Sequence, residues 1–110
     1  MKLKEHCQRC IDILGKPFDE VHYWLDELAN KPSHLRDKWK IDINHIGPIN
    51  PYHRRHRHNQ KGVEYIRLIY GDDAAKAAEL HIVDDLFNGD LSKVTDIPAD
   101  ERDYVKKGFV

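Results

Sequence analysis

The chain of 110 residues has few cysteines and lacks any long apolar run. Its two cysteines, Cys7 and Cys10, are three positions apart, which is no disulfide framework for a small secreted domain. No stretch approaches the roughly 20 apolar residues that cross a bilayer, and residues 1–5 lack the apolar stretch of a signal peptide. We therefore expect a cytoplasmic protein that has no membrane partner.

Several familiar catalytic motifs are missing as well. The chain has no phosphate-binding glycine loop, no Ser or Cys nucleophile motif, and no adjacent His-Asp dyad of the metal phosphohydrolase type. Residues 42–45 with Asn59 faintly resemble a ββα-metal nuclease, but the strand–strand–helix pattern is poor. Cys7 and Cys10 have no second Cys or His pair to complete a zinc ribbon, and they lie on an apolar stripe, so we expect buried, redox-inactive thiols.

The periodicity of apolar residues predicts an all-α protein with a single domain over residues 1–110. Helical spacing of three and four recurs along most of the chain, and 110 residues are too few for two cores. The links are short and no heptad persists, which indicates an irregular bundle of four to five helices. We predict helices at residues 2–14, 18–29, 51–70, 74–87 and 99–107, with a less regular segment at 31–50 that contains one short helix from Ser33 to Trp39.

The predicted helix at 51–70 carries a stripe that is apolar only in its second half. Val63, Ile66 and Ile69 follow the spacing of a buried face. The same spacing continued backwards reaches Gly62, Asn59, His58 and Arg54 or Arg55. A buried polar group without a partner costs about 1–3 kcal/mol, so we expect acidic residues, a metal or an anionic ligand to bind the side chains at this polar end of the stripe. Gly62 on the stripe would let another backbone come close.

Two His–Asp pairs have the same spacing. His22 and Asp26, and likewise His81 and Asp85, are four residues apart and share one helix face. Such a pair can ligate a divalent metal, or its carboxylate can orient the imidazole; the alternative is an ordinary hydrogen bond on a helix surface. We expect both pairs to converge on the polar end of the stripe, near His58.

Charge is unevenly distributed. Residues 53–67 hold five Lys or Arg against one Glu, a net +4, whereas residues 72–103 hold ten acidic side chains against three basic ones, a net −7. We expect these two segments to pair within the chain, which argues against nucleic-acid binding. The arginines at 54, 55 and 57 disfavour the charged form of the neighbouring histidines, which keeps the imidazoles available as ligands.

A set of short motifs occurs along the chain, namely His6, the block 16–26, His53-Arg54, Arg57-His58, Gly62, Gly71, the block 79–86 and Ile97-Pro98. In these motifs nearly the whole chain resembles a family of small His-rich helical domains from bacteria and phages that has no assigned activity. The resemblance implies that one set of residues acts together: His22, Trp24, Asp26, His53, Arg54, Arg57, His58, His81 and Asp85. Tyr52, the cysteines and the segment 31–50 depart from the family pattern.

The favoured hypothesis is a divalent metal, zinc or another transition metal, held by a set of four ligands: His22, His58, His81 and Asp85. Arg54 and Arg57 would hold an anionic small molecule such as a phosphate, and metal-activated water attacking a phosphoester would use these parts. No catalytic residue is assigned.

The alternative is a non-catalytic binding or inhibitory module, in which the same His, Arg and Asp side chains form a structural hydrogen-bond network. A weaker hypothesis is single-strand nucleic-acid binding through the arginines with Tyr52 and Trp39. A second copy of the chain, which would form a homodimer, is a further partner that the sequence leaves open.

Overall fold

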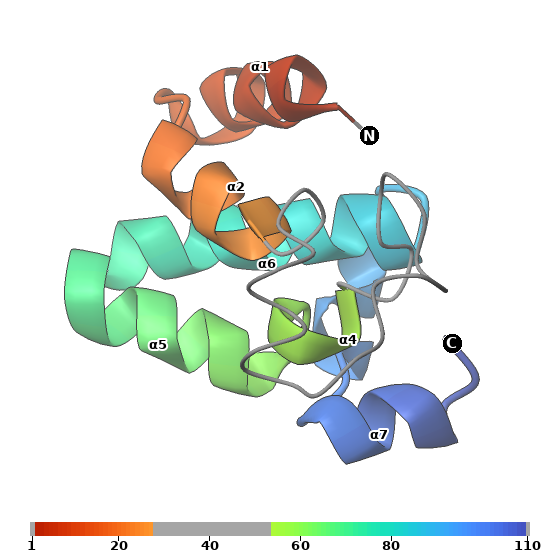
Figure 1. The fold of residues 1–110 in the computed structure, drawn as a ribbon. Helices are drawn as coiled ribbons and strands as arrows, with labels where there is room; N and C mark the ends of the chain where they lie inside the picture. The colour runs from red at the N-terminus through yellow and green to blue at the C-terminus, as the bar shows by residue number, and fades with distance from the viewer. Residues whose placement is uncertain (1, 28–53, 110) are drawn as a thin grey trace, which may run out of the picture.

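The computed structural model describes residues 2–27 and 54–109, and within them every regular element is helical (Figure 1). This confirms the all-α class. The elements are α1 (Leu3–Leu14), α2 (Asp19–Asp26), α4 (Arg54–Arg57), α5 (Gln60–Tyr70), α6 (Asp72–Leu86), the 3₁₀ helix η3 (Leu91–Asp96) and α7 (Glu101–Lys106).

Some predictions fall outside these residues, namely the helix from Ser33 to Trp39, the segment 42–45, Tyr52 and His53. None of the helices in the described ranges combines the length and the apolar character that a bilayer span needs.

The alanine-rich helix α6 runs through the middle of the molecule and contacts α1, α2, α5 and η3 (Figure 1). Its small residues Ala74, Ala75, Ala77 and Ala78 are at most 2% exposed, so neighbouring helices approach it closely. Helices α5 and α6 form a hairpin, because only Gly71, at φ +98°, lies between them.

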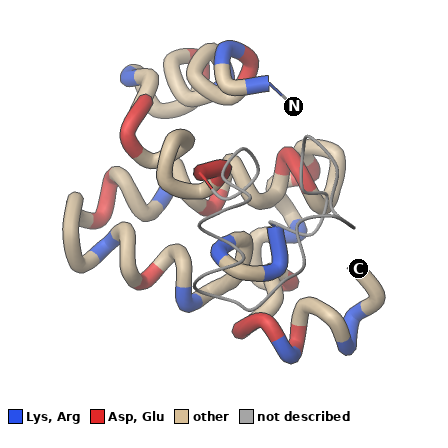
Figure 2. The backbone as a smooth tube through the Cα atoms, in the orientation of Figure 1, with Lys and Arg blue, Asp and Glu red and all other residues tan. Residues whose placement is uncertain are grey.

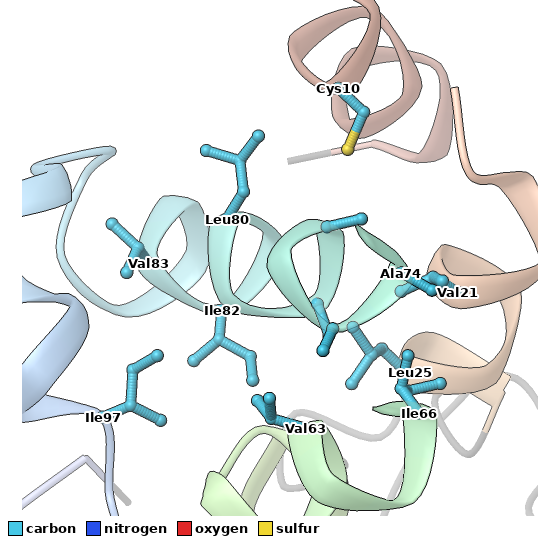
Figure 3. Close-up of a cluster of buried hydrophobic side chains, with 13 residues drawn as sticks. Cys10, Val21, Leu25, Val63, Ile66, Ala74, Leu80, Ile82, Val83 and Ile97 are labelled. Carbon is cyan, nitrogen blue, oxygen red and sulfur yellow. The ribbon is translucent and has the colours of Figure 1, made fainter. Parts of the chain in front are cut away.

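The apolar core lies where α2 and α5 meet α6. Figure 3 shows Leu25 beside Ile66 at the α2 and α5 contact, and Val63 below Ile82 of α6. All four side chains are at most 1% exposed. Burying an aliphatic side chain of this size contributes about 1.5–3 kcal/mol, so these contacts fix the position of α2 on the hairpin.

The helix predicted over 51–70 is interrupted within its described part, which corrects that prediction. α4 ends at Arg57 and α5 begins at Gln60, with the extended residue Asn59 as the cap of α5. Its Oδ1 accepts a hydrogen bond from the Gly62 backbone at 2.9 Å, and its Nδ2 donates to the Arg55 carbonyl at 3.0 Å. Asparagine favours such a cap over a helix interior because its side chain competes for backbone groups.

Gly62 sits against the backbone of the preceding turn, as predicted. A Cβ at this position would lie 1.9 Å from the carbonyl oxygen of Arg57, so only glycine fits. The buried stripe of α5 consists of Val63 and Ile66; Ile69, expected to be buried with them, is 54% exposed. Ile69 lies in the last turn of α5, next to Gly71, where the chain reverses into α6.

The two cysteines occupy different environments on α1. Cys10 is fully buried, as expected, whereas Cys7 is only half-buried and its Sγ lies 3.3 Å from Asp19 Oδ1. Burial raises the pKa of the Cys10 thiol to about 12, and burial together with Asp19 raises that of Cys7 to about 11. Neither sulfur is a thiolate near neutral pH, as expected of inert thiols.

Ion pairs join the basic and acidic segments, as predicted from their charge. Figure 2 shows Lys and Arg on α4 and α5 and Asp and Glu on α6 and α7. Arg67 of α5 pairs with Asp72 and Glu79 of the acidic segment at 3.2 and 3.7 Å. His56 Nδ1 also lies within hydrogen-bond distance of Glu101 Oε1 of α7, at 3.2 Å.

Candidate metal centre

Four buried histidines meet between the helices. His6 comes from α1, His22 from α2, His58 from the α4–α5 junction and His81 from α6, and each is at most 1% exposed. Histidine is usually only partly buried, and a fully buried ring needs partners for its nitrogens. The contacts of these rings therefore define the chemistry of the cluster.

His22 and His81 converge, as the sequence pattern predicted. Their Nδ1 atoms are 2.8 Å apart, and Nε2 of His22 lies 3.0 Å from the Pro17 carbonyl oxygen. Because a carbonyl only accepts, His22 carries its proton on Nε2 and its Nδ1 accepts from Nδ1–H of His81. Burial, with His81 and His6 nearby, lowers the pKa of His22 to about 4, so this ring is neutral. This hydrogen bond directs Nε2 of His81 towards the carboxylates.

Two imidazole nitrogens and two carboxylate oxygens form a compact set of possible ligand atoms. Nε2 of His58 lies 2.9 Å from Asp85 Oδ2 and 3.6 Å from Asp26 Oδ1, and Nε2 of His81 lies 3.2 and 3.3 Å from the same two oxygens. All pairs among these residues have ligand atoms within 4.8 Å. Ligands bound at about 2.0–2.1 Å in a tetrahedron are about 3.3 Å apart. Two imidazoles and two carboxylates suit zinc and other divalent transition metals.

A second trio, His6, His22 and His81, also brings nitrogens within 4.8 Å of one another. Its geometry is less suitable for a metal. The 2.8 Å between the Nδ1 atoms of His22 and His81 holds a proton, and Nε2 of His22 is turned to Pro17. The rings of His6 and His81 instead stack, with centroids 3.6 Å apart.

Asp85 is the anionic centre of the cluster. Its side chain is 2% exposed; Oδ2 faces His58 and His81, while Oδ1 lies 3.3 Å from His6 Nε2 and 3.5 Å from a terminal nitrogen of Arg54. Burial alone would raise the pKa of Asp85, but hydrogen bonds from His58, His6 and His81 outweigh it and hold the pKa well below its usual range. The carboxylate is therefore ionised.

His58 and His81 respond differently to the same surroundings. Burial lowers the pKa of His58 to about 4, despite its hydrogen bond to Asp85. Burial also acts to lower that of His81, but the hydrogen bonds of its ring with Asp26 and Asp85 outweigh burial, and the pKa is raised. Without a metal, a proton on His81 thus compensates part of the carboxylate charge.

The two predicted anion-binding arginines lie in different places. Arg54 reaches Asp85 and its side chain is 35% exposed. Arg57 turns to α2 instead: one terminal nitrogen donates to the Trp24 carbonyl at 2.7 Å, the other lies 3.3 Å from Glu27 Oε1, and the guanidinium covers the Trp24 ring at 4.3 Å. Arg54 therefore adjoins the cluster, and Arg57 holds α4 against α2.

Two residues of the cluster were absent from the ligand set predicted from sequence. The sequence pattern pairs Asp26 with His22, and the family resemblance adds Asp26 to the residues that act together; in the structure its Oδ1 faces His58 and His81. His6 enters the sequence analysis only as a residue that carries the resemblance, although it is four residues from Cys10 and shares its buried stripe. That spacing was a usable signal.

No known family model, curated protein or solved structure matches this chain. The resemblance to the small His-rich domains therefore stays a prediction. What the chain shows by itself is a buried His/Asp cluster whose geometry suits either a metal ion or a hydrogen-bond network.

Proposed function

We propose that this protein binds a divalent metal ion, zinc or another transition metal, through His58, His81, Asp26 and Asp85. One observation carries the proposal: two imidazole nitrogens and two carboxylate oxygens from three separate parts of the chain have N···O separations of 2.9 to 3.6 Å, close to the edges of a tetrahedral site. A hydrogen-bond network does not require two nitrogens and two carboxylate oxygens to lie within 4.8 Å of one another.

In this proposal His22 lies behind the metal ligands. It accepts the Nδ1 proton of His81 and is itself fixed by the Pro17 carbonyl. Metal-bound histidines commonly donate their second ring nitrogen in this way, which sets the tautomer and the ring orientation. His22, predicted from sequence as a ligand, is proposed here as the residue that orients one.

The exposed edge of the cluster suits an anionic small molecule. The side chains of Asp26 and Arg54 are 29% and 35% exposed, whereas those of His58 and His81 are fully buried. With four protein ligands in place, the metal would take up water only as a fifth ligand. Such a water would be a nucleophile near neutral pH, and Arg54 supplies a positive charge for a phosphoester or a similar anion. Hydrolysis of a phosphoester is the reaction these parts favour.

A second function is favoured by the proton on His81. Because the pKa of His81 is raised by Asp26 and Asp85, the cluster also satisfies itself as an ion-paired network without a metal. The chain would then be a binding or inhibitory module in which the cluster only fixes the packing of the helices.

Metal content of the untagged protein, measured by inductively coupled plasma mass spectrometry, separates the two functions. We expect near-stoichiometric metal in the wild type and loss of most of it in His58→Ala and His81→Ala. His56→Gln is the matched control, because His56 is equally a buried histidine but lies against Glu101. It should keep its metal. A folded wild type that takes up no divalent metal would exclude the metal protein and leave the network.

A further inference from the structure

A groove lies beside α4 and α7, away from the histidine cluster. Its volume is about 560 Å³, and the described residues that line it are Arg55, Glu101, Arg102, Val105 and Lys106. Small-molecule sites commonly have volumes of about 300–1,000 Å³. Arg54 of α4 contacts Asp85 of the cluster, whereas Arg55, the next residue of the same helix, lines the groove.

The described residues that line the groove have an excess of positive charge. Three of its lining residues, Arg55, Arg102 and Lys106, are cationic, and Glu101 is the one carboxylate among them. One carboxylate oxygen of Glu101 already has a partner, since Oε1 lies 3.2 Å from Nδ1 of His56. A cationic concave surface raises the local concentration of anions.

Arg55 lines this groove and carries a guanidinium nitrogen without an acceptor among the described residues. Its Nε is buried and finds no hydrogen-bond acceptor in the described chain. A guanidinium is always charged, and a buried charged donor without an acceptor is more costly than a neutral one. Phosphate and carboxylate oxygens are the acceptors that match its fork geometry.

We propose that this groove binds a small organic phosphate, with Arg55 as the central contact and Arg102 and Lys106 closing around the phosphoryl oxygens. Val105 and the aliphatic stems of Arg102 and Lys106 provide the apolar wall against which the organic part packs. This site is separate from the metal centre and does not depend on a metal being bound.

Titration with inorganic phosphate and glycerol 3-phosphate tests the site, with binding followed by amide shifts in ¹H–¹⁵N spectra and by calorimetry. We expect saturable shifts at residue 55 and at 101–106, unchanged by a chelator, with glycerol alone giving none. Arg55→Gln should weaken binding about tenfold, the equivalent of one charge-assisted hydrogen bond. Arg102→Gln should weaken it severalfold.

Lys107→Gln is the matched control, because it removes the same charge next to α7 while Lys107 pairs with Asp103 at 3.1 Å and does not line the groove. It should bind like the wild type. Three results would overturn the proposal: folded Arg55→Gln binding as tightly as the wild type, Lys107→Gln losing as much affinity as Arg55→Gln, or shifts confined to residues 54 and 85. Shifts confined to residues 54 and 85 that disappear with a chelator would place the anion at the metal. Shifts at residues 101–106 that a chelator leaves unchanged would support the groove, even if no metal is found.

Discussion

Nδ1 of His22 and Nδ1 of His81 lie 2.8 Å apart, so a ring on α2 determines the tautomer of a ring on α6. The Pro17 carbonyl lies 3.0 Å from Nε2 of His22 and holds the proton of His22 on that nitrogen, so His81 is the donor between the two Nδ1 atoms. Since the proton on Nδ1 of His81 follows from a backbone carbonyl, the orientation of its Nε2 towards Asp26 and Asp85 is fixed before any metal arrives, and less reorganisation is needed on binding.

His22 should therefore be replaceable by a residue that keeps its two hydrogen bonds. We expect His22→Phe to lower metal affinity about 10–100-fold, because His81 loses its acceptor, and His22→Gln to recover part of it. Competition with a chromophoric chelator measures both affinities. If His22→Gln lost metal as completely as His81→Ala, His22 would itself be a ligand.

The adjacent acids Asp84 and Asp85 should give opposite phenotypes. Asp84 accepts two hydrogen bonds from Arg9 at 3.1 and 3.2 Å, so Asp84→Asn should cost about 2 kcal/mol of unfolding free energy and leave metal content unchanged. Asp85→Asn should abolish metal binding, because it removes a ligand oxygen and the charge that faces three histidines. Urea denaturation and metal analysis of the two variants measure this. Loss of metal in both would mean that folding, not ligation, explains Asp85.

The stability of the metal-free protein should depend on pH, with a maximum above the usual histidine pKa of 6.5. Between about 4 and the usual 6.5, His22 and His58 bind protons in the unfolded chain but not in the folded one, so stability falls as the pH is lowered through this window. Two such groups give at most about 3 kcal/mol per pH unit. The raised pKa of His81 acts in the opposite sense, because its stabilisation is complete below the usual value and is lost as the pH rises through the folded one.

Urea midpoints in the presence of a chelator, measured from acid to mildly alkaline pH, test this dependence. His22→Gln should halve the slope of the acid limb, since only His58 then contributes, and leave the alkaline limb in place. A flat profile across the acid window would show that the two rings are not held neutral by burial.

Gly62 should not tolerate a side chain. Alanine is favoured over glycine in a helix by about 1 kcal/mol, but its Cβ would lie 1.9 Å from the Arg57 carbonyl oxygen. We expect Gly62→Ala to destabilise the protein by about 2–3 kcal/mol and to weaken metal binding, because the turn that carries His58 must move. Lys61→Ala, at the exposed neighbour, should change stability by less than about 0.5 kcal/mol. Equal stability of the two variants would contradict the close approach.

The cysteines should differ in their reaction with Ellman's reagent. Both thiols have raised pKa values, but Cys7 is half-buried and Cys10 fully buried. In the native protein we expect slow modification of Cys7 alone, with Cys10 reacting only on unfolding. Rapid reaction of Cys10 in the native state would mean that α1 opens from α2 and α6.

The sequence by itself determined what lies within one helix. The class and most helix positions follow from apolar spacing, and the His81–Asp85 and His22–Asp26 pairs follow from the 3.6-residue turn, which holds wherever the helix is placed. The break at Asn59 also had a local signal, an asparagine where a cap belongs, which the longer apolar stripe concealed.

Only the tertiary structure decided how these pairs meet. The approach of His6, His22, His58 and His81 depends on the packing of α1, α2 and the α4–α5 junction on α6, and helix crossings are set by many side-chain contacts rather than by the spacing along one segment. The same holds for the separation of Arg54 from Arg57: three residues apart on one short turn, one reaches Asp85 and the other Trp24, because different helices pack against each side of α4.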